Sequence, residues 1–566
     1  MLPLLLAAAL PAAVGVALHG AWLLDLRGTH PVSAFGASHV WGLDHLARQW
    51  VEGRVFEPDT DRLGFPRGGS APTLGWAPAL LALPFRPLLG PLGAYAVALF
   101  GSLALAGAAS QRWLRQLGAS PWAACAGAVV FATSPGVLNN LALGNIDKLS
   151  LWVYPAWLAL SGAVLGQRRG WLLLPLVGLV AFLAPMSEPY LGLFLPLACG
   201  PLLLLSALRL PRERWPVAAL RSALVLGLTA LSMLPARAYY AQYRSGSVGA
   251  AVFRPAAVRT ADGGDGWTRP WAGLDDLLRT PNAVPEDPER AFHVFYLGAV
   301  GLLAGVLLAC LPGVRRRLEG GLLLVLALLL VLGPYTVLPP AWGLSGPQQY
   351  LMPVHLLELA GYPTASGGQY YRALPLVALG YSALLAMGLS ARRPRIALPV
   401  GVLVVVLAMV DSVRATPEAW PRPLREVPCR PVLAAIASLE GPGAVLNLNM
   451  RASQSSNGEA LMLATLHGRP VNTLPLQTMG TGVDAAYGFL SPLAQVKDTA
   501  AAIAWLRNQG FRVLLDAPLG SPSLDTLRPA RLEALLGPPT WSDERCAAWD
   551  LGPVTGISEG TPAPAR

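Results

Sequence analysis

Charged residues are scarce in this sequence. They make up 13% of the 566 residues, whereas hydrophobic residues make up 54% and the mean hydropathy is +0.48. A soluble domain has about 25% charged residues. The apolar residues also occur in runs close to the roughly 20 residues that a helix needs to cross a bilayer. This composition excludes a soluble globular protein and predicts an integral membrane protein.

The sequence also lacks the common metal and nucleotide motifs. It has no CxxC, HExxH or GxxxxGK[ST] pattern, so nothing supports a structural zinc site or an ATP-hydrolysing enzyme. Cysteine is rare, and Cys125, Cys199 and Cys310 lie within apolar runs, as small packing residues do. Cys429 and Cys546 lie at opposite ends of the C-terminal region. We predict that these two form a disulfide, because the ends of a domain often approach each other.

Positive charge comes almost entirely from arginine, because Lys148 and Lys497 are the only lysines. A net charge of +10 would fit a protein that binds nucleic acid. The arginines gather between apolar runs, however, as they do in the short cytoplasmic loops of membrane proteins. We therefore expect membrane lipids, and no nucleic acid, as partners. The clusters are Arg112/Arg115, Arg168/Arg169, Arg209/Arg212/Arg214, Arg315/Arg316/Arg317 and Arg392/Arg393/Arg395.

Eleven apolar blocks separate these clusters and predict a topology. If every cluster faces the cytoplasm, the N-terminus lies on the cytoplasmic side of the cytoplasmic (inner) membrane. The C-terminus then lies on the outer side. We interpret the proline-broken segment 74–90 as interfacial or re-entrant, because a crossing there would move the arginines outside. The blocks fall near 2–24, 91–110, 119–135, 149–166, 171–186, 190–208, 217–235, 293–311, 320–338, 371–390 and 397–413.

The predicted fold is mainly α: a polytopic transmembrane helical bundle over 1–413, followed by a small α/β extracytoplasmic domain over 414–558. Residues 559–566 are predicted to be a disordered tail. In the second domain, strand-like segments ("GAVLNLNM", "FRVLLDAP", "CAAWDLG") alternate with helix-like ones ("GEALMLATLHG", "TAAAIAWLRNQG", "SLDTLRPARLEALLG"). Of the two long outer loops, 25–90 holds candidate site residues, and 236–292 is either a lid or an ordinary connector.

An amphipathic helix is predicted in the first outer loop. Apolar residues recur at helical spacing from Val40 to Trp50, which is typical of a helix at the membrane interface. Such a helix would hold Asp44 and His45 at the height of lipid headgroups, where a lipid-linked substrate presents its polar group. A structural role is also open, since Asp44 can pair with Arg48 one turn later.

A metal site has only weak support. Asp59 and Asp61 follow in the same loop and could share a divalent cation, although two carboxylates at this spacing are common. The sequence thus predicts no certain cofactor.

Several segments, in order along the chain, together resemble bacterial GT-C-type membrane glycosyltransferases, in their YfhO-like and mannosyltransferase-like branch. These segments are "EPDTDRLGFPRGGS", "GPLGAY", "ATSPGVLNNLALGNIDKLSLWVYPAWLAL", "SEPYLGLFLPL", "FYLGAVGLLAGVLLA", "QYYRALPLVALGYSALLAMGL", "HGRPVNTLP" and "LRNQGFRVLLD". The resemblance implies transfer of a sugar from a polyprenyl-phosphate donor to an acceptor at the outer face. It also implies an acid of the first outer loop as general base, and basic residues near span ends that hold the donor phosphate.

Two positions depart from the family pattern. Where relatives carry the acid, this chain reads Gly36-Ala37-Ser38-His39, which leaves Asp44 and Asp25 as the candidate catalytic acids. Asn145 stands after the glycine of "LGN", where a histidine is usual. Either another acid replaces the expected base or the chain has lost the chemistry.

The substrate-binding candidates lie near predicted span ends. Arg372 matches an arginine that recurs in the family, and its guanidinium suits phosphate, with Tyr371 beside it. Glu188 lies at a predicted turn between spans, where an acid is a functional candidate. His45, next to Asp44, is the remaining substrate-binding candidate. His467 in "HGRP" is interpreted as structural.

A different class of function stays open. The chain could be a flippase or exporter of lipid-linked glycans, or a catalytically silent component of envelope assembly. A transporter places ionisable residues within its spans. Here the predicted spans are nearly free of charge and the candidates gather in outer loops, which favours chemistry at the outer surface.

Overall fold

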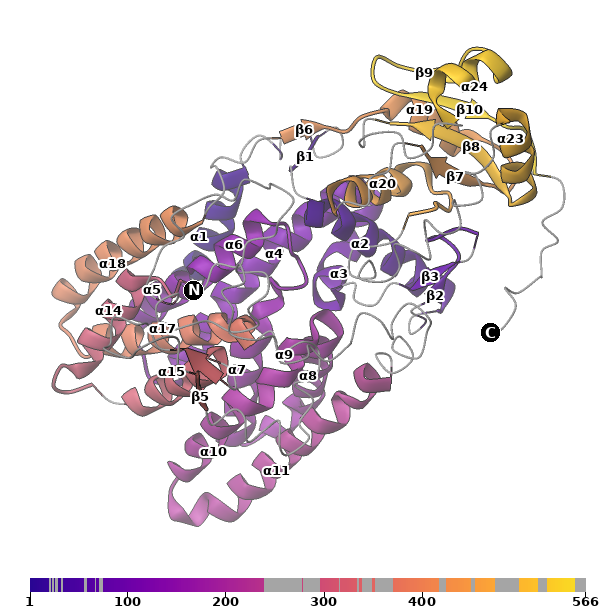
Figure 1. The fold of residues 1–566 in the computed structure, drawn as a ribbon. Helices are drawn as coiled ribbons and strands as arrows, with labels where there is room; N and C mark the ends of the chain where they lie inside the picture. The colour runs from indigo at the N-terminus through magenta and orange to yellow at the C-terminus, as the bar shows by residue number, and fades with distance from the viewer. Residues whose placement is uncertain are drawn as a thin grey trace.

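A computed structural model describes residues 1–238, 296–332, 370–416, 424–448, 454–473, 498–517 and 527–554, with short gaps at 20–21, 23–24, 26–28, 32–33, 55–56, 58, 67, 71–74 and 315. It also describes residue 277 and two paired strands, β4 (Tyr335–Val337) and β5 (Gln349–Leu351). The chain forms a large body of helices and, at one end, a smaller lobe that contains a sheet (Figure 1). The predicted loop 236–292 and the predicted tail fall almost entirely outside the described residues.

Each of the eleven predicted apolar blocks contains at least one helix. Six helical stretches are long and apolar enough to cross a membrane within the described part of the chain, and the pair α5 and α6, bent by 48°, would make a seventh. The predicted number of eleven spans is therefore not confirmed. The helices are α1 (Leu2–His19), α3 (Trp76–Ala82), α4 (Arg86–Gln116), α5 (Pro121–Ala132), α6 (Pro135–Ala142), α7 (Val153–Gly166), α8 (Leu174–Ser187), α9 (Pro189–Phe194), α10 (Gly200–Leu208), α11 (Trp215–Ser232), α14 (Ala299–Cys310), α15 (Arg317–Val331), α17 (Leu374–Ser390) and α18 (Pro394–Ala415).

Helix α17 lies at the centre of one side of this body. Every residue from Leu374 to Leu389 is buried, because α5, α14 and α15 pack around it. Helices α1, α11 and α18 instead expose rows of leucine and valine, such as Leu220 at 62% and Leu403 at 57%. A surface of this kind is stable in lipid and not in water. The described helices therefore fit a multi-pass membrane protein.

The segment 74–90, predicted to be interfacial or re-entrant, forms α3 and the first turn of α4. Gly90 has φ 70° and interrupts the helical backbone, and Pro91 follows it. A positive φ of this size favours glycine, so the break in α4 is encoded locally. Helix α3 packs against α4 and α8.

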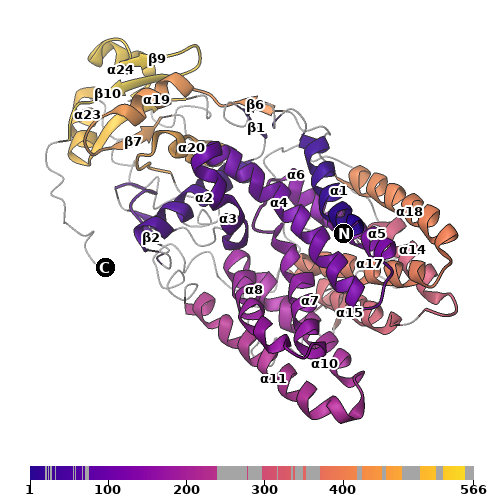
Figure 2. The same cartoon turned by 180° about the vertical axis from the view of Figure 1, so that it is seen from behind.

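Helix α2 (Ala34–Glu52) confirms the amphipathic helix predicted in the first outer loop. It does not lie free at a membrane surface, however. Helix α20 (Gln454–His467) of the C-terminal lobe packs along it, and α3 and α4 cover another side, as both views show (Figure 2). Trp41 is therefore buried, at 5% exposure.

A second link joins the first loop to the C-terminal region. Strand β1 (Thr29–Pro31) pairs antiparallel with β6 (Leu424–Glu426), so segments nearly 400 residues apart share one small sheet. In the first loop, β2 (Asp59–Thr60) also pairs with β3 (Gly69–Ser70).

The C-terminal lobe contains the predicted alternation of helices and strands. Its sheet has the order β7-β8-β10-β9, with β7 parallel to β8 and the remaining pairs antiparallel. The predicted Cys429–Cys546 disulfide is confirmed, with a Cα–Cα distance of 5.4 Å. The boundaries at 413 and 558 stay predictions. Besides α20, the elements are α19 (Arg430–Ser438), β7 (Ala444–Asn447), α23 (Thr499–Asn508), β8 (Phe511–Asp516), α24 (Pro529–Leu536), β9 (Trp541–Ser542) and β10 (Ala547–Asp550).

Candidate substrate pocket

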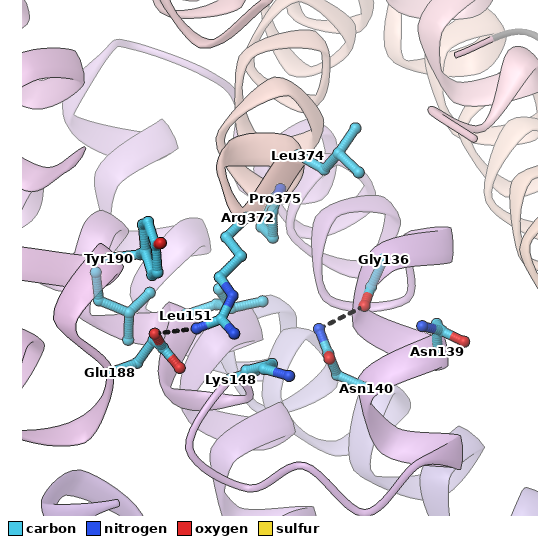
Figure 3. A pocket seen from close by; sticks show the side chains of 11 residues that line it. Gly136, Asn139, Asn140, Lys148, Leu151, Glu188, Tyr190, Arg372, Leu374 and Pro375 are labelled. Atoms are coloured by element: carbon cyan, nitrogen blue, oxygen red, sulfur yellow. Dashed lines mark hydrogen bonds and ion pairs between the residues drawn. The ribbon is translucent and has the colours of Figure 1, made fainter. Parts of the chain in front are cut away.

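One pocket gathers polar side chains at the ends of several apolar helices. Its walls come from α6, the segment before α7, the junction of α8 and α9, and the start of α17. Apolar residues form part of the wall, so the pocket combines charged side chains with an apolar surface. The lining residues are Gly136, Asn139, Asn140, Lys148, Leu151, Glu188, Tyr190, Leu191, Arg372, Leu374 and Pro375 (Figure 3).

Local sequence explains how two of the charged residues reach the pocket. Glu188 has extended backbone (φ −155°, ψ 122°) between α8 and α9, because the following Pro189 disfavours the helical conformation at the residue before it. Arg372 lies in a 3-10 turn (Tyr370–Ala373) that leads into α17, where Pro375 occupies the first turn.

Arg372 is held by two neighbours. Its guanidinium donates a hydrogen bond to Glu188 Oε1, forming an ion pair, and lies 4.8 Å from the centre of the Tyr190 ring. Figure 3 shows the arginine extending from the start of α17 towards Glu188 and Lys148. The Glu188 side chain is only 6% exposed. A buried carboxylate of this kind requires a partner, and Arg372 supplies it.

Lys148 is the second cation of the pocket. Its ammonium makes no salt bridge with any residue that the structure describes. Burial and the charge of Arg372 lower its pKa, although Asp147 and Glu188 oppose the shift. An anion bound in the pocket would therefore face two cations, of which only Arg372 already has an ion-pair partner among the described residues.

The two carboxylates near the pocket have different environments. Burial raises the pKa of Glu188, and Asp147 adds to the rise, while Arg372 and Lys148 oppose it. Burial also favours a raised pKa for Asp147, but His39, Lys148 and Arg372 outweigh it and the pKa is lowered. Asp147 is therefore ionised at neutral pH, and Glu188 keeps its proton to a higher pH than an ordinary glutamate because its pKa is raised.

The two departures from the family pattern meet in space beside this pocket. His39 Nε2 lies 3.5 Å from Asp147 Oδ1, and the side chain of Asn145 also acts on the ring and raises its pKa. Burial lowers the pKa of His39, so the ring is neutral. An acid, Asp147, and a histidine, His39, are thus both present here. The histidine lies on α2 and the acid lies in the segment before α7.

Asp44 lies elsewhere, on α2, where its side chain reaches the start of α4. Its Oδ2 accepts a hydrogen bond from Arg48 Nε at 2.8 Å, and its Oδ1 accepts one from Arg86 Nε at 2.7 Å. Both oxygens of this buried carboxylate are thus engaged by guanidinium groups, which is the structural alternative that the Arg48 spacing allowed. His45, one residue on, stacks on Trp41 with 4.6 Å between ring centres, and neither ring nitrogen has a hydrogen-bond partner among the described residues.

The other predicted site residues are not in the pocket either. Asp25 is exposed after α1, and Asp61 is exposed in the first loop. The side chains of Tyr371 and Asp59 fall outside the described residues. Within the described chain, no group of three or more His, Cys, Asp or Glu residues could hold a metal ion. Of the predicted set, the structure brings together only Arg372 and Glu188.

Sequence reasoning missed Lys148, Asp147 and Tyr190. A signal was present for the first two, because one of only two lysines in the chain stands next to an aspartate in an otherwise apolar stretch. His467 accepts a hydrogen bond from the Arg469 backbone N–H at 3.1 Å, which is consistent with the structural role that we expected.

No protein-family model matches the sequence, and neither does any curated protein sequence. The fold is similar to that of an arabinofuranosyltransferase, AftD, from Mycobacteria (16% identity, TM-score 0.49), over 90% of this chain and 35% of that one. It is also similar to an oligosaccharyltransferase of Archaeoglobus fulgidus (11%, 0.48, 90% and 69%) and to ArnT from Cupriavidus metallidurans (12%, 0.29, 96% and 97%). The chain spans about a third of the length of the mycobacterial enzyme. Similarities this low define no activity, so the function below is proposed from the pocket.

Proposed function

We propose that the chain is a GT-C-type membrane glycosyltransferase that takes a sugar from a polyprenyl-phosphate donor and passes it to an acceptor at the outer face of the cytoplasmic membrane. The observation that carries this proposal is that Arg372 and Lys148 line one pocket, walled by Leu151, Leu191 and Leu374, in which Lys148 makes no salt bridge with a described residue. Two cations suit a phosphate, and an apolar wall suits the lipid that bears it.

The reaction requires that the bond between the sugar's anomeric carbon and the phosphate oxygen breaks, with the electron pair leaving on the phosphate. Lys148 and Arg372 would stabilise that developing charge. The acceptor hydroxyl forms the new bond to the anomeric carbon and gives its proton to a carboxylate. Glu188 is the carboxylate that lines the pocket, and its raised pKa suits a proton acceptor. Asp147 is close enough to influence it.

One assay tests the proposal. Purified chain in lipid is incubated with a panel of polyprenyl-phosphate sugars, and the release of polyprenyl phosphate is followed. Release by the unmodified chain that falls about 10²–10⁴-fold in Glu188→Gln supports the proposal. No release with any donor would favour the silent assembly component instead.

Asp44 and Asp25 stay predictions from the sequence, and the same assay separates them from Glu188. Asp44→Asn and Asp25→Asn are measured in parallel, with activity expressed per folded molecule. If either lowers turnover as much as Glu188→Gln, the proton acceptor lies outside the pocket. A flippase or exporter would instead move the intact donor across vesicles without releasing polyprenyl phosphate.

A further inference from the structure

A second cavity lies between the helical body and the C-terminal lobe. It is lined by Leu89, Gly90, Pro91, Leu92, Arg430, Leu433, Ala434 and Leu466, and it holds roughly 690 Å³ of empty space, its open mouth included. None of these residues lines the pocket that contains Arg372. The break in α4 forms one wall, and α19 and α20 form the other.

The break in α4 at Gly90 borders this cavity. A methyl group built at Gly90 would meet no atom within 4 Å, so the backbone there faces empty space. Directly before it, Phe85 and Leu88 are 44% and 70% exposed. The mouth therefore opens beside an apolar surface, at the start of a helix that is apolar enough to cross a membrane.

Among the described residues that line the cavity, Arg430 alone is charged. It is exposed and makes no ion pair within the described part of the chain. It is also the first residue of α19, so the positive end of the helix dipole adds to its charge. The remaining lining residues are apolar or glycine. An occupant must therefore combine an apolar chain with a negatively charged head.

We propose that this cavity binds an anionic phospholipid, with an acyl chain against Leu89, Ala434 and Leu466 and the phosphate on Arg430. The polyprenyl-phosphate donor also has an apolar chain and a phosphate. Its phosphate is needed at Lys148 and Arg372, however, in a pocket that shares no residue with this cavity. A membrane phospholipid carries its phosphate at the bilayer surface, where a cation adjoining an apolar groove binds it.

The test uses the full chain reconstituted in phosphatidylcholine vesicles that contain a minor fraction of phosphatidylglycerol. After gentle extraction, native mass spectrometry measures the lipid that stays bound. We expect several-fold enrichment of phosphatidylglycerol on the unmodified chain, loss of that enrichment in Arg430→Ala, and its retention in Arg430→Lys. Arg531→Ala is the matched control, because Arg531 is an exposed arginine near the start of another helix of the same lobe. It should keep the enrichment.

A second variant tests the apolar part of the site. Ala434 is exposed on the lining, so Ala434→Trp should fill the groove and reduce retention of both lipids while the lobe stays folded. Equal enrichment in Arg430→Ala and the unmodified chain would overturn the proposal. So would equal retention of phosphatidylcholine and phosphatidylglycerol, or displacement of the bound phospholipid by added polyprenyl phosphate. None of these results depends on glycosyl transfer, so the two proposals fail separately.

Discussion

Arg372 and Lys148 are both cations of one pocket, but they differ in how their charge is balanced. Arg372 is tied to Glu188 and covers the Tyr190 ring, so it is in place before any ligand arrives. Lys148 has no such partner in the described chain. Substitution of the two residues should therefore have different effects on stability and on donor binding.

We expect Lys148→Met to weaken donor binding about 10- to 100-fold, the value of one hydrogen bond to a charged group, with little change in stability. Arg372→Ala should weaken binding too, and should also lower the free energy of unfolding by about 3 kcal/mol, because Glu188 would stay buried without its partner. Thermal unfolding and donor titration measure the two effects. Arg531→Ala, which removes an exposed positive charge that does not line the pocket, is the control. Equal destabilisation by both substitutions would contradict this division of roles.

At the scale of single elements, α2 connects the two parts of the structure. Asp44 joins it to Arg86 at the start of α4, and α20 of the C-terminal lobe packs along its length. Asp44→Asn should lower the thermal midpoint, because Arg48 and Arg86 would lose the charge that they share. Glu52→Gln, which removes an exposed acid from the same helix, is the matched control and should have a small effect. An unchanged midpoint together with lost turnover would instead favour Asp44 as the base.

Two buried histidines, one on α2 and one on α20, should also make the folded chain less stable in acid. Burial lowers the pKa of His45 to about 3, with Arg62, Arg54 and Arg48 adding to the shift; burial lowers that of His467 to about 3 as well, with Arg469 and Arg48 adding. Both rings are neutral in the folded chain. An unfolded histidine binds a proton below about pH 6.5, so the unfolded state gains protons first and the free energy of unfolding falls as the pH drops from about 6.5 towards 3.

At about pH 5, this effect amounts to about 2 kcal/mol for each histidine, since each pH unit below the unfolded pKa is worth about 1.4 kcal/mol. We expect His45→Phe, which keeps the stack on Trp41, to reduce the loss in thermal midpoint between about pH 7.5 and pH 5. An identical loss in the variant would show that His45 does not titrate on unfolding.

The sequence predicted the helices well and the pocket poorly, for a physical reason. The apolar composition of runs such as Leu374–Ser390 is enough to predict a helix, and Arg372 lies just before this run. Asp44 looked catalytic because an amphipathic helix has one polar face. The sequence does not say that Arg86, 42 residues away, reaches the same carboxylate. Lys148, Glu188 and Arg372 meet only through tertiary packing, which local periodicity does not encode.

At the scale of the whole molecule, five arginine clusters predict that the C-terminal lobe lies outside the cytoplasm. A reporter that is active only outside, fused after Pro417, should therefore be active. The same reporter fused at Gly118, in the turn beside Arg115, should be silent and serves as the control. The disulfide between Cys429 and Cys546 fits an oxidising compartment. Activity at the control site and silence at Pro417 would reverse the orientation.

The pairing of β1 with β6 also restricts how often the chain can cross the bilayer. Two hydrogen-bonded strands must lie in the same compartment, and here one directly follows α1 while the other follows α18. The number of crossings between them is therefore even. If α1 itself crosses the bilayer, the total number of spans is odd. Six spans are then inconsistent with this pairing, whereas seven and eleven are both consistent with it. Any revised count of spans must change by two at a time.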